Sequence, residues 1–339
     1  MSADIEEPLI DLTERIPLHS KRTERLQRKQ QKKKSKPITA HATLLDLPAE
    51  LLSHILSFAR PSDAINLSAA SKPLRYFVRE HEPSISKDII RNRYATLAQC
   101  FPLPVMLSAV DPAVHPVLLS PKRQELLNIH KKPYQHVQPP DPLQICSCLT
   151  CVLAWNNLCL TMDLEHWQDH LDRREPIPMI DRGKNPEWNQ RLNVDNASHV
   201  ERALTSPLWY ALILQTHLST TVRSVKRYHG IRSNSPARKK RPPFHMNLLD
   251  AESGTDLWLE RSGPPSYEFP YRRDCYYSLE VYVPNRRWDK GEERWLYQPA
   301  SQHERDVRWV VEHAERMRVR ELQQEQSVSK EQNVGKEQK

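Results

Sequence analysis

The chain has 339 residues and a net charge of +8; 38% of its residues are hydrophobic, 28 are Pro and only 6 are Gly. This length accommodates one or two domains plus tails, and no apolar run approaches the roughly 18 residues that a membrane span needs. No two glycines have the spacing of a GxGxxG, Walker or GxSxG motif, which argues against the common nucleotide-dependent enzymes. The N-terminus lacks the apolar core of a signal peptide, and the six cysteines do not resemble the framework of a small secreted domain. We therefore expect a protein of the nucleus, the cytoplasm or both, without a membrane partner.

Two short segments carry the positive charge. Residues 21–36 include nine basic residues and one acidic residue, and residues 223–241 include eight basic residues and none acidic, so the remaining chain is acidic. A nucleic-acid-binding domain would spread its cations over a folded face, so we do not expect nucleic acid as a partner. Both segments contain candidate nuclear import residues: Lys21, Arg22, Lys32, Lys33, Lys34, Lys36, Arg238, Lys239, Lys240 and Arg241. A solvated segment or a weak phosphate contact is the alternative interpretation.

Residues 1–40 are polar and rich in Lys, Arg and Gln, which predicts a disordered basic tail. From residue 44 the pattern changes and predicts three short amphipathic helices. Pro48 suits the first turn of the first helix, Pro61 ends that helix, and Ser71 is a suitable N-cap for the third. So short a segment cannot bury its own apolar residues, so much of its apolar surface must contact another element or another protein.

This segment contains Leu47-Pro48-Ala49-Glu50-Leu51-Leu52, Ile55-Leu56, Asp63, Asn66-Leu67-Ser68 and Ser71-Lys72-Pro73-Leu74-Arg75. It resembles the F-box, the motif by which substrate receptors dock on the Skp adaptor of SCF-type cullin–RING ubiquitin ligases. The resemblance implies an adaptor-binding surface made of Leu47, Pro48, Leu51, Leu52, Ile55 and Leu56, and a helical core made of Leu67, Leu74, Phe77 and Val78. Ala64 and Ala70 depart from the family, where larger aliphatic residues are usual, and both would weaken packing or docking. An unrelated helical hairpin is the alternative interpretation.

The region after this segment combines proline-rich stretches with periodic ones. The expected elements are helical fragments around 86–99 and 121–130, long helices over 148–172 and 207–227, strands at 256–260, 275–283 and 294–298, and a charged helix over 302–323. We therefore predict an α+β, mostly helical fold. A three-helix F-box at 41–84 precedes a mixed domain at 85–325 with long helices and a small late antiparallel sheet. Disorder is expected in a basic loop at about 228–244 and in the tail at 326–339.

Cys148, Cys151, His166 and His170 have the spacing of a Cys2His2 zinc site. The helical periodicity of 148–172 opposes such a site, because Cys151 and His166 would lie about 22 Å apart along one helix. We therefore favour small buried cysteines on a core helix. We predict no metal, no cofactor and no catalytic residue.

The resemblance implies a non-catalytic adaptor whose partners are a Skp-family adaptor, through it a cullin, and an unknown protein target. The whole chain also resembles uncharacterised F-box proteins of filamentous fungi. The alternative function is a nuclear nucleic-acid- or chromatin-associated regulator that uses the zinc site and the basic segments. Bound zinc and salt-dependent affinity for nucleic acid would distinguish it.

Overall fold

The computed structural model describes residues 21–34, 44–127, 136–181, 184–233, 246–261 and 272–337. The chain divides into two compact units, residues 1–47 and residues 48–339. The first unit contains helix α1 (Lys21–Lys34) and the 3₁₀ helix η1 (Leu44–Asp46). Helix α1 lies within the predicted disordered tail of residues 1–40; residues 21–34 lack Gly and Pro and consist largely of good helix formers. The rest of that tail lies outside the described residues.

Residues 49–93 form α2 (Ala49–Ser57), α3 (Pro61–Ala70) and α4 (Lys72–Arg93), in agreement with the three predicted helices. Pro61 occupies the first turn of α3, where its missing N–H is not needed. The Ser71 hydroxyl caps α4 by accepting a hydrogen bond from the backbone N–H of Leu74 at 3.4 Å. Helix α4 continues through Pro83 to Arg93 and thus crosses the predicted domain boundary at 84/85 without a break.

Short helices follow α4. They are α5 (Ala95–Cys100), η2 (Leu107–Ala109), η3 (Pro112–Val114), α6 (His115–Leu118) and α7 (Pro121–Leu126). Helices η3, α6 and α7 each have a proline in the first turn. Because a proline disfavours continuation of a preceding helix, these closely spaced prolines keep the helices short. The helical fragment predicted around 86–99 is divided between α4 and α5 at Tyr94, and the fragment predicted around 121–130 corresponds to α7.

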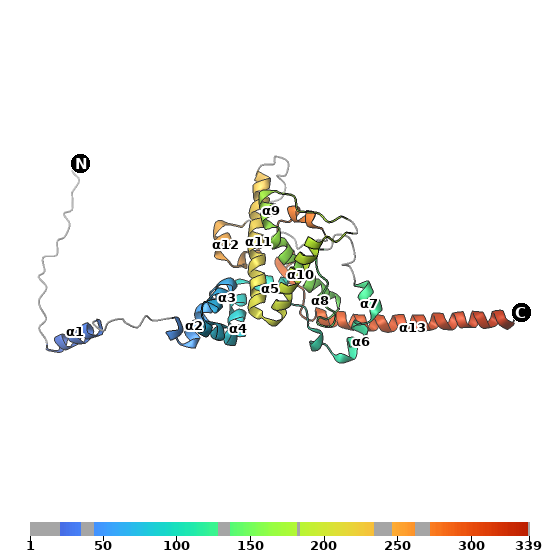
Figure 1. The fold of residues 1–339 in the computed structure, drawn as a ribbon, viewed down its shortest axis with the longest axis horizontal. Helices are drawn as coiled ribbons and strands as arrows, with labels where there is room; N and C mark the ends of the chain where they lie inside the picture. The colour runs from blue at the N-terminus through green and yellow to red at the C-terminus, as the bar shows by residue number, and fades with distance from the viewer. Residues whose placement is uncertain are drawn as a thin grey trace. The chain divides into compact units, whose positions relative to one another are not determined.

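The centre of the second unit consists of α8 (Leu149–His166), α9 (Gln168–Arg173), α10 (Glu187–Thr205) and α11 (Pro207–Ser233). Helix α11 packs against α3, α4, α8, α9 and α10, and it forms the upright axis of this unit in Figure 1. Helices α8 and α11 confirm the two long helices that the sequence predicts, although Trp167 separates α8 from α9. Helix α10 was not predicted, because its buried face includes Asn189, Asn193 and Asn196 in place of an apolar stripe.

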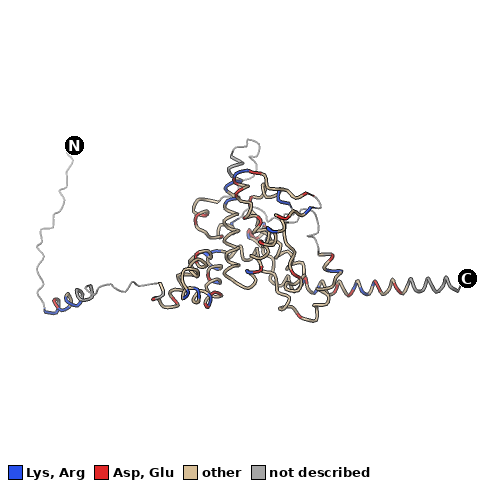
Figure 2. Tube along the Cα trace, viewed as in Figure 1, with Lys and Arg blue, Asp and Glu red and all other residues tan. Residues whose placement is uncertain are grey.

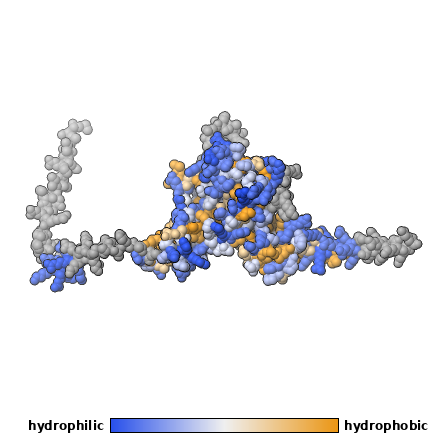
Figure 3. Space-filling view, viewed as in Figure 1, coloured by the Kyte–Doolittle hydropathy of each residue, from blue (hydrophilic) through white to orange (hydrophobic). Residues whose placement is uncertain are grey.

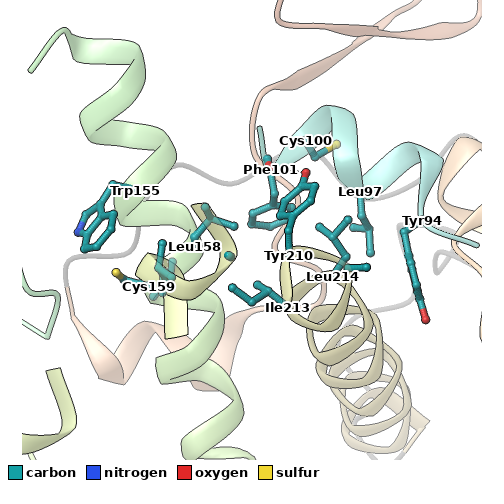
Figure 4. Close-up of a cluster of buried hydrophobic side chains, with 14 of the residues drawn as sticks. Tyr94, Leu97, Cys100, Phe101, Trp155, Leu158, Cys159, Tyr210, Ile213 and Leu214 are labelled. Atoms are coloured by element: carbon teal, nitrogen blue, oxygen red, sulfur yellow. Dashed lines mark hydrogen bonds between the residues drawn. The ribbon is translucent and has the colours of Figure 1, made fainter. Parts of the chain in front are cut away.

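The core forms where α5, α8 and α11 meet (Figure 4). Its large buried side chains include Tyr94, Leu97, Phe101, Trp155, Leu158, Tyr210, Ile213 and Leu214. The Tyr210 hydroxyl donates a hydrogen bond to the carbonyl oxygen of Phe101 at 2.8 Å, which satisfies the polar end of this buried ring. The core therefore joins elements that lie more than 100 residues apart in the chain.

The late region contains α12 (Leu248–Ser253), the 3₁₀ helices η5 (Leu257–Glu260) and η6 (Arg273–Ser278), strands β1 (Arg286–Asp289) and β2 (Arg294–Tyr297), and α13 (Gln302–Glu337). Strands β1 and β2 form an antiparallel pair in which Trp288 lies opposite Trp295. This hairpin confirms the small late antiparallel sheet and the strand predicted at 294–298. Helix α13 begins beside α6 and α8, and it then extends outward (Figure 1).

Two of the three predicted strands are wrong. Residues 257–260 form η5, and residues 273–278 form η6. Residues 279–283 are buried or nearly so but do not pair with a strand. Instead, the carbonyl oxygen of Tyr282 accepts a hydrogen bond from His217 Nε2 at 2.6 Å. The His217 side chain thus provides the hydrogen-bond partner of this carbonyl group, for which the alternating β-forming residues predict a neighbouring strand.

Two predicted disordered segments are partly helical. Helix α13 continues to Glu337, through most of the tail at 326–339, and α11 extends to Ser233, into the loop predicted at 228–244. Both extensions lack proline, so no residue there is sterically excluded from a helix. Among the described helices, none is both long and apolar enough to cross a bilayer.

Candidate functional site

Helix α2 separates its apolar residues onto two faces. Leu52 and Leu56 are 2% and 4% exposed and belong to the core. Leu51, Ile55 and Phe58 are 51%, 49% and 57% exposed, and they recur at the four- and three-residue intervals that align side chains on one side of a helix. We call these three residues the α2 apolar face. Figure 3 shows apolar surface in the region of α2 on the side drawn.

Hydrogen bonds begin α2 at Pro48 and attach its end to α4. At its start, the carbonyl oxygen of Pro48 accepts hydrogen bonds from the N–H groups of Leu51 and Leu52 at 3.0 and 3.1 Å. At its end, Arg93 Nη2 of α4 donates to the carbonyl oxygen of Phe58 at 2.5 Å. The last carbonyl groups of a helix have no partner within the helix, so this arginine stabilises the end of α2. The α2 apolar face therefore lies on an anchored helix.

The predicted adaptor-binding residues occupy different environments. Leu47 and Pro48 are exposed, as are Leu51 and Ile55. Leu52 and Leu56 are buried instead of partner-facing in this structure, because the helical period of 3.6 residues places them on the side of α2 that α4 covers. Phe58 was missed, although it lies seven residues after Leu51.

The predicted helical core of this segment is buried to different degrees. Leu74 and Val78 are 8% and 3% exposed, whereas Leu67 and Phe77 are partly buried and pack against the core. Ala64, one of the two departures from the family pattern, is completely buried. Its small side chain lies where α3 closely approaches its neighbours. Ala70 is exposed.

Hydrogen bonds connect α3 and α4 to α11. Gln215 Nε2 donates to the Ser62 hydroxyl at 2.9 Å, and Gln215 Oε1 accepts from the Ser62 backbone N–H at 3.0 Å. Glu82 Oε1 of α4 accepts from the backbone N–H of Leu208, in the first turn of α11, at 3.1 Å. Helices α3 and α4, the second of which packs against α2, are therefore attached to α11.

The four residues of the predicted zinc site do not meet. Cys148 precedes α8, Cys151 lies in its first turn and His166 is its last residue, so the helix separates Cys151 from His166 by about 22 Å. His170 lies in α9, where its ring contacts the edge of Trp167. These four residues therefore do not form a Cys2His2 site, in agreement with the interpretation that the sequence favoured, because a single helix cannot bring both of its ends to one ion.

A different group of residues surrounds the two predicted cysteines. The ligand-type atoms of Cys146, Cys148, Cys151 and His303 all lie within 4.8 Å of one another. His303 Nδ1 lies 3.3 Å from the sulfur of Cys148 and 3.3 Å from that of Cys151. Hydrogen bonds from the Cys148 and Cys151 thiols lower the pKa of the Cys146 thiol well below its ordinary value. We call these four residues the Cys3His cluster.

Cys146 and His303 could not be assigned to this cluster from spacing. The sequence contains 15 histidines, and His303 lies 155 residues after Cys148. The one available signal was the additional thiol of Cys146, two residues before Cys148.

The candidate import residues are described only in part. Lys21, Arg22, Lys32, Lys33 and Lys34 belong to α1, whereas Lys36 and the block from Arg238 to Arg241 lie outside the described residues. Figure 2 shows α1 dominated by Lys and Arg, whereas basic and acidic residues are interspersed along the helices of the second unit. This interspersed pattern gives the nucleic-acid alternative no added support.

Comparison with protein families matches the F-box domain at residues 44–85. The match ends within α4 and includes the whole of α2 and α3. Comparison with curated proteins and with solved structures gave no significant match. The family match therefore concerns the segment that carries the α2 apolar face.

Proposed function

We propose that this chain, which contains an F-box domain at residues 44–85, is the substrate receptor of an SCF-type ubiquitin ligase. An F-box domain implies an adaptor role in such complexes. The observation that carries the proposal is the α2 apolar face, where three large apolar side chains about half exposed lie next to one another on an anchored helix. A Skp-family adaptor is the partner that would cover them.

Docking would remove this apolar surface from water. Full burial of a large apolar side chain contributes about 1.5–3 kcal/mol relative to full exposure, so three half-exposed side chains supply roughly 3 kcal/mol. Such clustered anchors, surrounded by polar residues, are typical of the centre of a protein interface. Glu50 directly precedes Leu51 and Ser53 lies between Leu51 and Ile55 in the sequence, and both would contribute to the polar surroundings.

The proposed mechanism is proximity, without a chemical step on this chain. The F-box domain holds the receptor on the adaptor and, through it, on a cullin, while the region after residue 85 holds a protein target. A ubiquitin-conjugating enzyme on the same assembly then meets the target at high effective concentration. The attachment of α3 and α4 to α11 through Ser62, Gln215 and Glu82 would limit the range of positions that the target can reach.

The place of action proposed is the nucleus, the cytoplasm or both, with the basic segments at 21–36 and 238–241 as import signals. Replacing Arg238, Lys239, Lys240 and Arg241 together with Ala in a fluorescently tagged chain tests the second segment. Loss of nuclear fluorescence supports its use for import, and an unchanged distribution argues against it.

The decisive experiment measures binding to purified Skp adaptor. Leu51→Asp and Ile55→Asp each place a charge where the docked interface would exclude water, so the affinity should fall by about 100-fold or more. Leu322→Asp is the matched control, because Leu322 is 50% exposed on α13 and Leu51 is 51% exposed on α2. Circular dichroism checks that all three variants remain folded.

Three results are possible, and each decides for or against the proposed receptor. Adaptor binding by the wild type and by Leu322→Asp, but not by the two α2 variants, supports the proposed receptor. Adaptor binding retained by both α2 variants would show that this face is not the docking surface. Absence of binding by the folded wild type would remove the ligase role altogether.

A further inference from the structure

The Cys3His cluster has no part in adaptor docking, yet it concentrates three thiols and an imidazole in one place. Cys146 and Cys148 are 0% exposed and Cys151 is 1% exposed, while His303 is partly buried. All three cysteines are free. Three thiols cannot all be satisfied by one disulfide, so pairing two of them would leave the third and the imidazole unexplained.

The distances within the cluster match those around a tetrahedral zinc ion. Zinc bonds of about 2.3 Å to sulfur and about 2.0 Å to nitrogen place neighbouring sulfur atoms about 3.8 Å apart and sulfur and nitrogen about 3.5 Å apart. His303 Nδ1 lies 3.3 Å from two of the sulfur atoms, and the whole set spans at most 4.8 Å. Changes of up to about 1 Å in these separations would bring the four atoms onto one coordination sphere.

The backbone around the cluster is arranged to support thiolate ligands. The N–H of Val105 donates to Cys151 Sγ at 3.3 Å, and the N–H of Cys148 lies 3.5 Å from Cys146 Sγ. Cys151 also lies in the first turn of α8, where the helix dipole favours negative charge. Such outer contacts orient metal ligands and tune their basicity.

A positive charge balances the cluster from another side. Arg123 Nη2 donates to the carbonyl oxygen of Ser147, between two of the cysteines, at 2.6 Å. The arginine interacts electrostatically with Cys146 and Cys148. Three thiolates around a divalent ion carry a net charge of −1, which this arginine offsets.

A second contact brings His303 to the cysteines. Asp306 Oδ2 accepts a hydrogen bond from the Thr150 backbone N–H at 2.9 Å, which places the first turn of α13 on the first turn of α8. Gln302 Nε2 donates to Asp306 Oδ1 at 2.8 Å and fixes the carboxylate. Since Asp306 lies three residues after His303, both side chains project from the same side of α13. The geometry is therefore set by the chain itself.

We propose that Cys146, Cys148, Cys151 and His303 bind one zinc ion that joins the segment before α8 to the start of α13. Four protein ligands of the Cys3His type leave no open coordination position, so the site is structural and not catalytic. The donor set of three sulfur atoms and one nitrogen suits zinc better than magnesium or calcium, which prefer oxygen. Binding releases the thiol protons to solvent and changes no oxidation state.

The first test is the metal content of the full-length protein, purified without chelator and measured for all transition metals by mass spectrometry. Wild type should contain about one zinc per chain, and Cys148→Ser or His303→Asn should reduce this to below about 0.2. Cys159→Ser is the matched control, because Cys159 is a buried cysteine of α8 outside the cluster, and His166→Asn is the control for the ligand set rejected above. Both controls should keep their zinc.

The second test does not depend on a variant that folds. Chelated wild type is titrated with Co²⁺, which should produce the intense visible absorption of a tetrahedral cobalt–thiolate site, displaced by equimolar Zn²⁺. Amide hydrogen exchange at residues 302–312 should accelerate at least about tenfold after chelation, because α13 loses the metal ion that links it to α8.

Three outcomes would overturn the proposal. The first is wild type that contains no metal and binds no cobalt. The second is zinc retained in both Cys148→Ser and His303→Asn, and the third is a stoichiometric metal other than zinc. Adaptor binding is measured separately, and the α2 variants should keep their zinc, so failure of this proposal and failure of the receptor function are distinguishable.

Discussion

The F-box helices and the helices that follow them depart from the usual distribution of side chains in opposite ways. Helix α2 leaves Leu51, Ile55 and Phe58 about half exposed. The region between α8 and η6 instead buries charge, since Asp163 and Arg273 are 0% and 3% exposed as a two-point ion pair. The first arrangement leaves apolar side chains in contact with water, whereas the second pairs its buried charges within the chain. The difference separates the proposed docking surface from a buried polar network that favours one packing of the core.

The largest expected effect comes from breaking the buried ion pair. Burial alone would raise the pKa of Asp163, but the charge of Arg273 and hydrogen bonds from Arg273 and Tyr276 hold that pKa below its usual value. Asp163→Asn leaves the Arg273 guanidinium buried without its counter-ion, so the free energy of unfolding should fall by about 3–5 kcal/mol. Urea unfolding followed by tryptophan fluorescence measures the change.

A nearby exposed carboxylate supplies the control. Asp169 of α9 pairs with Arg223, but its side chain is 76% exposed and water can replace the contact. Asp169→Asn should therefore leave the unfolding transition nearly unchanged. Equal effects of the two substitutions would mean that burial does not distinguish these ion pairs.

The next effect concerns a buried histidine between α11 and the late region. Burial lowers the pKa of His217 to about 4, while its hydrogen bond to the carbonyl oxygen of Tyr282 opposes this shift only in part. The unfolded chain therefore takes up a proton near pH 6.5, whereas the native state does so only near pH 4. Stability contributed by neutral His217 is present above pH 6.5 and should decrease by about 3 kcal/mol as the pH falls to 4.

His217→Gln isolates this contribution, because the amide can donate to Tyr282 without titrating. The measurement is the free energy of unfolding against pH for both proteins. Burial also raises the pKa of Asp256 to about 7, and this shift increases the free energy of unfolding as the pH falls over the same range. The contribution of Asp256 is the same in the wild type and in His217→Gln. The difference between the two curves should therefore follow His217, and parallel curves would contradict the assignment.

The smallest effect tests the junction between the two regions. Ala64 of α3 is 0% exposed, whereas Ala70 at the end of the same helix is exposed. Ala64→Leu restores the large residue usual in F-box domains, but it should overpack this junction and destabilise the protein by about 1–3 kcal/mol. Ala70→Leu is the matched control and should change the unfolding midpoint little. Adaptor binding should survive both, and a stabilised Ala64→Leu variant would show unfilled space beneath α3.

Local pattern predicted the helices better than it predicted contacts. Capping residues and prolines located α2, α3 and the start of α4, and periodicity located α8 and α11. Periodicity failed for α10, whose buried face carries asparagines, and for 275–283, where His217 replaces a partner strand. Asparagine side chains pack in the core in the first case, and a histidine side chain forms a hydrogen bond with a buried carbonyl group in the second. The hydropathy pattern of the sequence reveals neither kind of contact.

The candidate sites divide in the same way. Leu51 and Ile55 were predicted and are exposed, but Leu52 and Leu56 were assigned to the same surface because a motif does not specify which face of a helix is covered. Only the packing of α2 on α4 decides that. For the cysteines, the spacing of Cys148 and Cys151 was visible, but the sequence offered His166 and His170 as their only partners and thereby favoured buried cysteines without a metal.

The sequence alone determined that the chain carries an F-box segment, that its fold is mostly helical and that its cations are concentrated in two short segments. These properties depend on residues within a few turns of one another, where capping, periodicity and charge act directly. Tertiary structure decided which apolar residues remain exposed and which histidine meets the cysteines. His303 lies 155 residues after Cys148, and only the packing of α13 on α8 brings them to 3.3 Å.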